Sequence, residues 1–316
     1  MSGPLSQASR FFCSELSRRS AEQTFGTASV GAVWFLLEYP HGWGAHALRD
    51  SALSDDVKKF FTDALASIKH SRILFIKTDR ARRDARMNFF VVRCRERGAY
   101  AVRLRLENYE QARELDLASI ARGEDLQGGV FTRDPLYLVC THGRRDKCCA
   151  KFGIPVYNAL RDFAGDAVWQ SSHVGGDRFA ANILCFPHGL FYAHADEEAA
   201  RRVVAEYGER RVVNEKFRGR ACYSHVLQAA EVFVRAESGV SGVEDLRFVS
   251  SERARGESWR VKFYEAARAC IHEARVRRSM SDFRNLITCH STEASHVPQF
   301  RLEDYRVVDD QTTRAV

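Results

Sequence analysis

The sequence lacks any apolar run long enough to cross a membrane. Its longest apolar runs, such as residues 31–37, are interrupted by charge or proline well short of the roughly 20 residues that a transmembrane helix needs. Residues 1–7 have neither a basic start nor an apolar segment with a cleavage site, so no secretory signal is predicted. We therefore expect a cytoplasmic protein without a membrane partner.

A basic run interleaved with aromatic residues is also missing. The net charge is +7 and the isoelectric point is about 9.0. That charge permits acidic partners, but the arginines are dispersed among acidic residues, as in residues 206–211. The pattern therefore argues against nucleic-acid binding.

The cysteines lack the spacing of a disulfide framework. There are nine of them, an odd number, in a chain too long to need disulfides for stability. Reduced thiols, some of them selected as metal ligands, are the expected state. Six of the nine cysteines stand alone in the sequence, several in apolar or strand-like surroundings, and most of these are predicted to be inert small side chains: Cys13, Cys94, Cys185, Cys222, Cys270 and Cys289.

What the sequence does contain is one order of hydrophobic patterns that occurs twice: strand, helix, strand, strand, strand, helix. The expected elements are 32–39, 54–68, 72–77, 88–93, 99–106 and 110–120 in the first copy, and 136–140, 149–163, 167–170, 179–186, 190–194 and 196–207 in the second. This order predicts an α/β fold of tandem thioredoxin-like domains, each a mixed sheet flanked by helices.

The predicted domain boundaries follow from this repeat. We expect a leader over 1–24, a first thioredoxin-like domain over 25–130, a second over 131–236, and a small β-rich extension and tail over 237–316. The extension should hold strands near Leu246, Trp259, Ile271 and Leu286 after a helix over 224–236, with the last dozen residues frayed. The first domain has no cysteine in its first loop and an Arg/Asp-rich second loop, 79–86, so we expect it to lack metal ligands. It would act as a scaffold or bind through the loop that contains Trp43.

Two loops of the second domain carry the candidate chemistry. Residues 140–149 and 173–178 each follow a short strand, so two neighbouring strand ends would bring Cys140, Cys149 and His173 to one metal centre. Cys149 is expected to begin a helix, whose N-terminus, with the nearby cations Arg144, Arg145 and Lys147, would favour a thiolate. The alternative is a pair of buried cysteines beside an unrelated turn. In the second loop, Gly175 and Gly176 would let the backbone approach a ligand and let residues 173 and 177 face one point.

These residues resemble the sucrase/ferredoxin-like family, which is similar to thioredoxin-like 2Fe-2S ferredoxins. The resemblance extends over about residues 25–235 and rests on the residues that the two loops share with the family: Cys140, His142, Arg145, Asp146, Cys149, Ser172 to Gly176, Phe179, Ala180 and Asn182. It continues more thinly through residues 36–44 and 218–220. It implies that 131–236 is a thioredoxin-like ferredoxin domain, with a 2Fe-2S cluster held by two cysteines and by two histidines in an H-x-G-G-H loop. Cys149 would be the second thiolate and Cys148 its neighbour.

The chain departs from the family pattern at Asp177, which stands where the second histidine is expected. A carboxylate can bind iron, and its negative charge would lower the reduction potential. The predicted ligands are then Cys140, Cys149, His173 and Asp177, with His142, Arg145, Cys148, Gly175, Gly176 and Arg178 around them. Alternatively, Asp177 pairs with Arg178 or caps the following backbone, which would leave the fourth position to solvent or to His142, His188 or His194.

The leading functional prediction is an iron-sulfur electron-transfer protein rather than a catalyst, with an unidentified redox partner whose surface could be acidic. One alternative is a thiol-disulfide oxidoreductase that uses Cys149 or Cys148, although adjacent cysteines close only a strained disulfide. Another is a zinc-binding interaction module. The sequence shows no paired carboxylates placed for glycosidic cleavage, so sugar hydrolysis is not expected.

Overall fold

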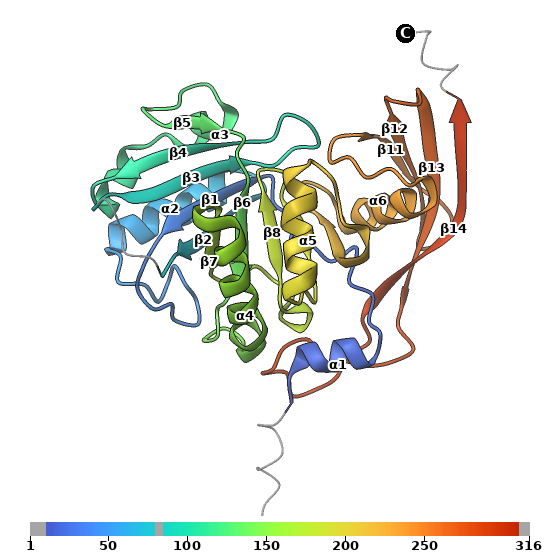
Figure 1. Ribbon diagram of the computed structural model, residues 1–316, viewed down its shortest axis with the longest axis horizontal. Helices are drawn as coiled ribbons and strands as arrows, with labels where there is room; N and C mark the ends of the chain where they lie inside the picture. Colours follow the sequence, from blue (N-terminus) through green and yellow to red (C-terminus); the bar gives the residue numbers. More distant parts are fainter. Residues whose placement is uncertain (1–10, 80–84, 310–316) are drawn as a thin grey trace, which may run out of the picture.

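A large curled mixed sheet forms the centre of the molecule, with helices on its faces and a separate small antiparallel sheet near the C-terminus (Figure 1). The computed structural model describes residues 11–79 and 85–309. The large sheet has ten strands in the order β10-β9-β8-β6-β7-β2-β1-β3-β4-β5, and the small one has four in the order β11-β12-β13-β14. None of the helices in the described ranges is long and apolar enough to span a bilayer.

The elements of the first half and of the leader are α1 (Cys13–Arg19), β1 (Val33–Glu38), α2 (Asp55–Ser67), β2 (Ser71–Lys77), β3 (Met87–Arg93), β4 (Tyr100–Leu106), η1 (Tyr109–Glu114), α3 (Leu117–Arg122) and β5 (Val130–Thr132). The second half contains β6 (Leu136–Cys140), α4 (Lys147–Ala164), η2 (Gly165–Ala167), β7 (Val168–Ser171), η3 (Asp177–Phe179), β8 (Ile183–Phe186), β9 (Leu190–Tyr192), α5 (Glu197–Gly208), η4 (Asn214–Lys216) and β10 (Phe217–Arg220). The C-terminal part contains α6 (His225–Ser238), β11 (Leu246–Arg253), β12 (Ser258–Glu265), β13 (Cys270–Met280) and β14 (Pro298–Asp309).

The two halves of the large sheet repeat one strand order. In the first half, β1 is parallel to β2 and antiparallel to β3, which is antiparallel to β4. In the second half, β6 has the same relation to β7 and β8, and β8 pairs with β9. The halves join through an antiparallel contact between β2 and β7. The predicted α/β fold, with its repeated arrangement and its β-rich C-terminal part, is therefore confirmed, and the repeats share one sheet.

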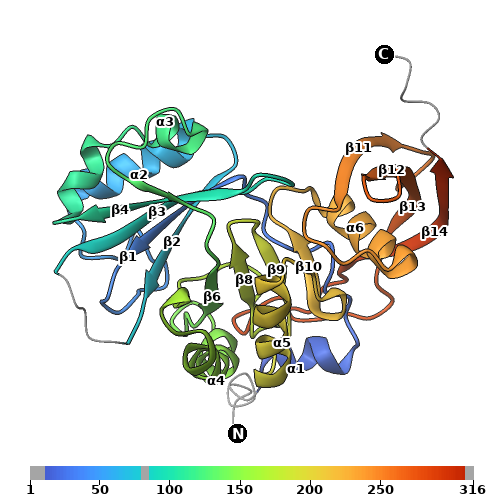
Figure 2. The same cartoon turned by 45° about the horizontal axis from the view of Figure 1, so that its top comes forward.

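The core lies on both faces of this sheet. Helices α2 and α3 cover one face of the first half (Figure 2), and α4 and α5 cover one face of the second. The opposite faces of the two halves curl around a common core, in which Trp34 and Leu36 of β1 pack with Leu138 of β6 and Phe191 of β9. Because successive strand residues point to opposite faces, strands buried on both faces are largely apolar: β6 is apolar throughout, and β1 is apolar up to its last residue, Glu38.

Several element predictions were wrong in detail. The helix expected over 110–120 is divided into η1 and α3, because the Asp116 side chain accepts the N–H groups of Ala118 and Ser119 and begins a new helix. Helix α4 begins at Lys147 rather than Cys149, because Asp146 caps it by accepting the Cys148 N–H. Strands β5 and β10 were not predicted. In the described residues no strand covers Leu286; the fourth strand of the small sheet is β14, which contains Phe300.

The predicted leader contains a packed helix. In α1, Cys13, Ser14 and Ser17 are buried, and the Ser14 hydroxyl donates to the Ala180 carbonyl at 2.6 Å. The expected fraying of the tail is wrong for residues 305–309, which belong to β14. The remaining parts of the leader, the tail and the Arg/Asp-rich loop, namely 1–10, 310–316 and 80–84, lie outside the described residues.

A buried histidine beside the turn between β8 and β9 gives a pH prediction. His188 lies 2.6 Å from the Tyr207 hydroxyl and 3.3 Å from Glu244, and burial lowers the pKa of His188 to about 4. The unfolded chain takes up this proton near pH 6.5 and the folded chain only near pH 4, so folding stability falls as the pH drops through this window. Between pH 7 and pH 4, we expect His188 to lower the free energy of unfolding by about 2 to 3 kcal/mol. Urea unfolding of His188→Gln at several pH values should show a correspondingly weaker pH dependence; an identical dependence would contradict the assignment.

Candidate metal centre

The strand order explains why the two loops lie together. Strands β6 and β7 are parallel neighbours, and Cys140 at the end of β6 pairs in register with Ser171 at the end of β7. Parallel strands end at the same sheet edge, so the loop after Cys140 and the loop after Ser171 start side by side. Cys149 lies in the first turn of α4, while His173 belongs to the loop that leads into η3 and Asp177 begins η3.

All four predicted ligand residues meet at this edge. One ligand atom each of Cys140, Cys149 and His173 lie within 4.8 Å of one another. The Asp177 Oδ1 atom is 2.9 Å from His173 Nδ1 and 3.4 Å from the Cys149 sulfur. Both cysteines and Asp177 are buried, whereas the His173 side chain is 25% exposed. The centre is therefore closed on its sulfur side and open at the imidazole.

The four side chains strongly alter one another's protonation. A hydrogen bond from Cys149 holds the pKa of Cys140 well below its usual value, and the same contact, with burial, raises the pKa of Cys149. Burial disfavours the charged form of His173, but its contacts with Asp177 and Cys140 outweigh that effect and raise the pKa of His173 to about 9. Burial likewise opposes ionisation of Asp177, and its contact with His173 lowers the pKa of that carboxyl. The group thus favours a Cys140 thiolate and an Asp177 carboxylate, which are the ionised forms that bind metals, whereas His173 would release its proton on binding one.

The donor set fits a metal. Among the described residues, His173 Nδ1 is a buried nitrogen whose contact with Asp177 at 2.9 Å does not have the geometry of a hydrogen bond. Two thiols, an imidazole and a carboxylate are ligands of both iron and zinc. These donors lie close together, so the two cysteines are not beside an unrelated turn, and their role as metal ligands stays a prediction.

The other histidines considered for the fourth position have different partners. His142 accepts the His173 N–H at Nδ1, 3.1 Å away, and donates from Nε2 to the Gly44 carbonyl at 2.7 Å, so both ring nitrogens are used. Burial lowers the pKa of His142, in agreement with this neutral form. His188 contacts Tyr207 and Glu244, and His194 contacts Ser14, Ser17 and Arg18. Asp177, which contacts His173 and Cys149, is therefore the candidate for the fourth position, and His142 positions the backbone of His173.

The alternative roles for Asp177 are not observed. Arg178, its suggested ion-pair partner, instead contacts Glu22 at 2.6 Å. The Ala180 N–H, which an Asp177 cap could have bound, bonds to the Asp177 backbone carbonyl instead of the side chain. The carboxylate itself points toward His173 and Cys149.

The glycines of the second loop serve packing around a buried arginine. Gly175 and Gly176 have φ values of 91° and 81°, a region that favours glycine. A Cβ on Gly176 would lie 2.5 Å from the Arg218 guanidinium, and one on Gly175 would lie 2.4 Å from the Ser29 hydroxyl. Arg218 is buried and donates to the Gly175 carbonyl and the Asn182 side chain at 3.0 and 2.7 Å. The close approach predicted for these glycines is thus to Ser29 and Arg218.

A cleft opens beside the exposed face of His173. It has a volume of about 500 Å³, and His142, Arg145 and His173 line it together with Arg49 and Lys58 of the first half. Trp43 packs edge-on against His142 and is only 8% exposed, and residues 45–49 of the same segment line the cleft. Binding through the loop that contains Trp43 stays a prediction.

The fold and the donor set together define a mixed α/β protein with a candidate Cys/His metal site. A family model described as Sucrase/ferredoxin-like matches residues 24–219, more than half of the chain, so the chain belongs to that family. This confirms the resemblance inferred from the two loops. No curated protein and no solved structure matched the chain at a significant level.

Proposed function

We propose that Cys140, Cys149, His173 and Asp177 hold a 2Fe-2S cluster and that the protein is a one-electron carrier. The observation that supports this most is the convergence of two buried thiols with an imidazole and a carboxylate in a member of this family. When bound, such a cluster supplies a centre that takes up or releases one electron. The cysteines would hold one iron, and His173 with Asp177 would hold the other, nearer the cleft.

The cleft beside His173 is the proposed docking site for the redox partner. His173 is the only one of the four proposed ligands with substantial exposure, so a partner seated in the cleft would come closest to the cluster there. Arg49, Lys58 and Arg145 border the cleft, which favours a partner with an acidic surface. The assignment of residues 131–236 as the ferredoxin-type unit is part of this proposal.

Replacing one cysteine ligand provides the test. We expect Cys140→Ala, purified without oxygen, to lose nearly all iron and acid-labile sulfide, because two thiolates are needed to hold one iron. Cys185→Ala is the matched control, since Cys185 is also a fully buried strand cysteine of the large sheet but does not belong to this donor group. The control should retain the wild-type content. Equal iron and sulfide in both variants, or none in the wild type after reconstitution, would exclude the proposal.

A single zinc ion is a second candidate, because the ligand atoms of Cys140, Cys149 and His173 are all within 4.8 Å of one another, a separation that one tetrahedral ion can bridge. This version of the site would make the protein an interaction module without redox activity. One equivalent of zinc that is lost in Cys140→Ala, with no iron and no visible absorption, would decide for it.

The thiol-disulfide oxidoreductase alternative receives less support. Cys148 and Cys149 are both essentially inaccessible, and they face different groups of side chains. A substrate disulfide therefore has no access to either sulfur in this conformation.

A further inference from the structure

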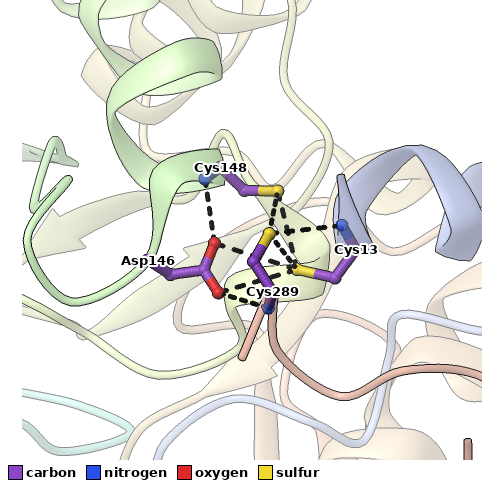
Figure 3. Close-up of side chains that lie close together, drawn as sticks. All are labelled: Cys13, Asp146, Cys148 and Cys289. Atoms are coloured by element: carbon purple, nitrogen blue, oxygen red, sulfur yellow. Dashed lines mark hydrogen bonds between the residues drawn. The ribbon is translucent and has the colours of Figure 1, made fainter. Parts of the chain in front are cut away.

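Three other cysteines and an aspartate converge next to the centre described above. Cys13 begins α1, Cys148 lies in the first turn of α4, and Cys289 belongs to the segment 281–297 between β13 and β14. Asp146 is the N-cap of α4. Figure 3 shows the three sulfurs turned toward one another with the Asp146 carboxylate beside them. Cys13, Cys148 and Asp146 are fully buried, and Cys289 is half-buried.

The spacing of the sulfurs matches a single metal ion. The sulfurs of Cys13 and Cys148 are 3.5 Å apart, those of Cys148 and Cys289 are 3.3 Å apart, and those of Cys289 and Cys13 are 3.6 Å apart. These distances far exceed the roughly 2.05 Å of a disulfide bond. They are close to the roughly 3.8 Å that separates two sulfurs on a tetrahedral ion with bonds of about 2.3 Å. A point at that bond length from all three sulfurs therefore exists just outside their plane.

The carboxylate is placed as a fourth donor. Both Asp146 oxygens lie 3.9 Å from the Cys13 sulfur, and one ligand atom from each of the four residues lies within 4.8 Å of the others. One oxygen accepts the Cys148 N–H at 2.8 Å and the other accepts the Cys289 N–H at 2.7 Å. These bonds fix the orientation of the carboxylate, as the outer hydrogen bonds of ligating carboxylates do in metal sites. Helix capping accounts for the first bond, and the second ties Cys289 to the group.

The sulfurs also receive backbone hydrogen bonds. The Cys13 N–H donates to the Cys289 sulfur and the Ser14 N–H to the Cys148 sulfur, each at 3.5 Å. N–H groups directed at sulfur favour thiolates over thiols, which is the state that a metal requires. The arrangement therefore places three sulfur donors, two of which accept a backbone N–H, and one carboxylate around a common point.

We propose that Cys13, Cys148, Cys289 and Asp146 form a second metal site, which binds one tetrahedral zinc ion. Three thiolates and a carboxylate suit zinc, which favours closed four-coordinate sites when its role is structural. Three sulfurs that all lie within 3.6 Å of one another fit one ion, because the two irons of a 2Fe-2S cluster would divide their ligands into two pairs.

The site would join three distant parts of the chain. Figures 1 and 2 show the segment before β14 running from the small sheet to the neighbourhood of α1. Cys13 and Cys289 both lie outside residues 24–219, so the family match does not include half of the donors. Zinc would thus fasten the N-terminal helix and the C-terminal segment to the N-terminus of α4.

The same ion would support the first centre without sharing a ligand with it. Cys148 faces the zinc group, and its neighbour Cys149 faces Cys140 and Asp177. Helix α1 packs against η3, the element that begins with Asp177, through the bond from Ser14 to Ala180. The second site stands on its own geometry and does not depend on which metal the first centre holds.

Metal analysis of the full-length chain tests the proposal. Wild-type protein purified under reducing conditions should hold one equivalent of zinc that Cys289→Ala lacks, and Cys289→Ala should keep the iron of the first centre. The matched control Cys222→Ala changes another half-buried cysteine that belongs to neither group and should keep both metals. Cys140→Ala should lose iron and keep zinc, which separates a failure of this proposal from a failure of the iron-sulfur assignment.

Cobalt provides a readout that needs no variant. Wild-type protein freed of zinc and loaded with Co²⁺ should show the visible bands of tetrahedral cobalt and sulfur-to-cobalt charge transfer, and a competing equivalent of Zn²⁺ should abolish them. The proposal is overturned if the reduced wild type binds neither ion at this stoichiometry or if Cys289→Ala retains the zinc. A disulfide between any two of Cys13, Cys148 and Cys289, found by mass spectrometry in protein prepared under reducing conditions, would also overturn it.

Discussion

The Asp177→His variant is expected to have a reduction potential on the order of 100 mV higher than the wild type, because a neutral ligand replaces an anionic one at the outer iron. The carboxylate of Asp177 is 95% shielded from solvent and contacts His173 and Cys149, so little water screens its charge. An anionic ligand stabilises the oxidised cluster more than the reduced one. The potential is measured by spectroelectrochemical titration of the purified protein.

The control for this prediction is Asp162→His, which makes the same substitution at an exposed position of α4. Its potential should stay within the experimental error of the wild type. Asp177→Ala should instead contain less iron, because one donor is missing. An unchanged potential in Asp177→His, with full iron content in Asp177→Ala, would show that Asp177 does not bind iron.

The Glu231→Gln variant is expected to lose about 3 to 5 kcal/mol of unfolding free energy. Glu231 of α6 accepts hydrogen bonds from Arg220 of β10 at 2.7 Å and from Arg235 at 2.9 Å, and all three side chains are buried. Both arginines lower the pKa of Glu231, against the effect of burial. The amide removes the one anion between two buried cations, which leaves their charge uncompensated.

Urea unfolding of the wild type and of Glu231→Gln measures this loss of unfolding free energy. Glu237→Gln is the matched control because it removes an exposed carboxylate from the last turn of the same helix, and it should change the free energy of unfolding by less than about 0.5 kcal/mol. If Glu231→Gln were as stable as Glu237→Gln, the buried ion group would contribute nothing to the attachment of α6 to β10.

The positions of the central strands along the chain could be predicted from the sequence because strands buried on both faces are nearly uninterrupted apolar runs. Leu136–Cys140 was predicted at its observed limits for this reason. Strand β10 was missed because its sequence is Phe-Arg-Gly-Arg. Its two buried arginines, Arg218 and Arg220, donate hydrogen bonds to acceptors in other segments, Asn182 and Glu231. Propensity cannot identify a strand whose side chains are satisfied by tertiary contacts.

The first candidate centre could be predicted from the sequence because its candidate ligands lie at the ends of two neighbouring strands and in the segments that follow them. The second group could not, since its three cysteines are separated by more than a hundred residues and share no local spacing. Cys13 and Cys289 were therefore predicted to be inert. Only the packing of α1 and of the segment 281–297 against the start of α4 brings them to Cys148.

The proposed cluster site at the ends of β6 and β7 consists of four side chains: Cys140, Cys149, His173 and Asp177. The most direct measurement is the electron paramagnetic resonance spectrum of the anaerobically purified wild type before and after reduction by dithionite. We expect the oxidised protein to absorb visible light and to give no paramagnetic resonance signal. After reduction it should give one spin-half signal per cluster, which Cys140→Ala lacks. A colourless protein that holds zinc at this site, or that gives no signal after cluster reconstitution, would contradict it.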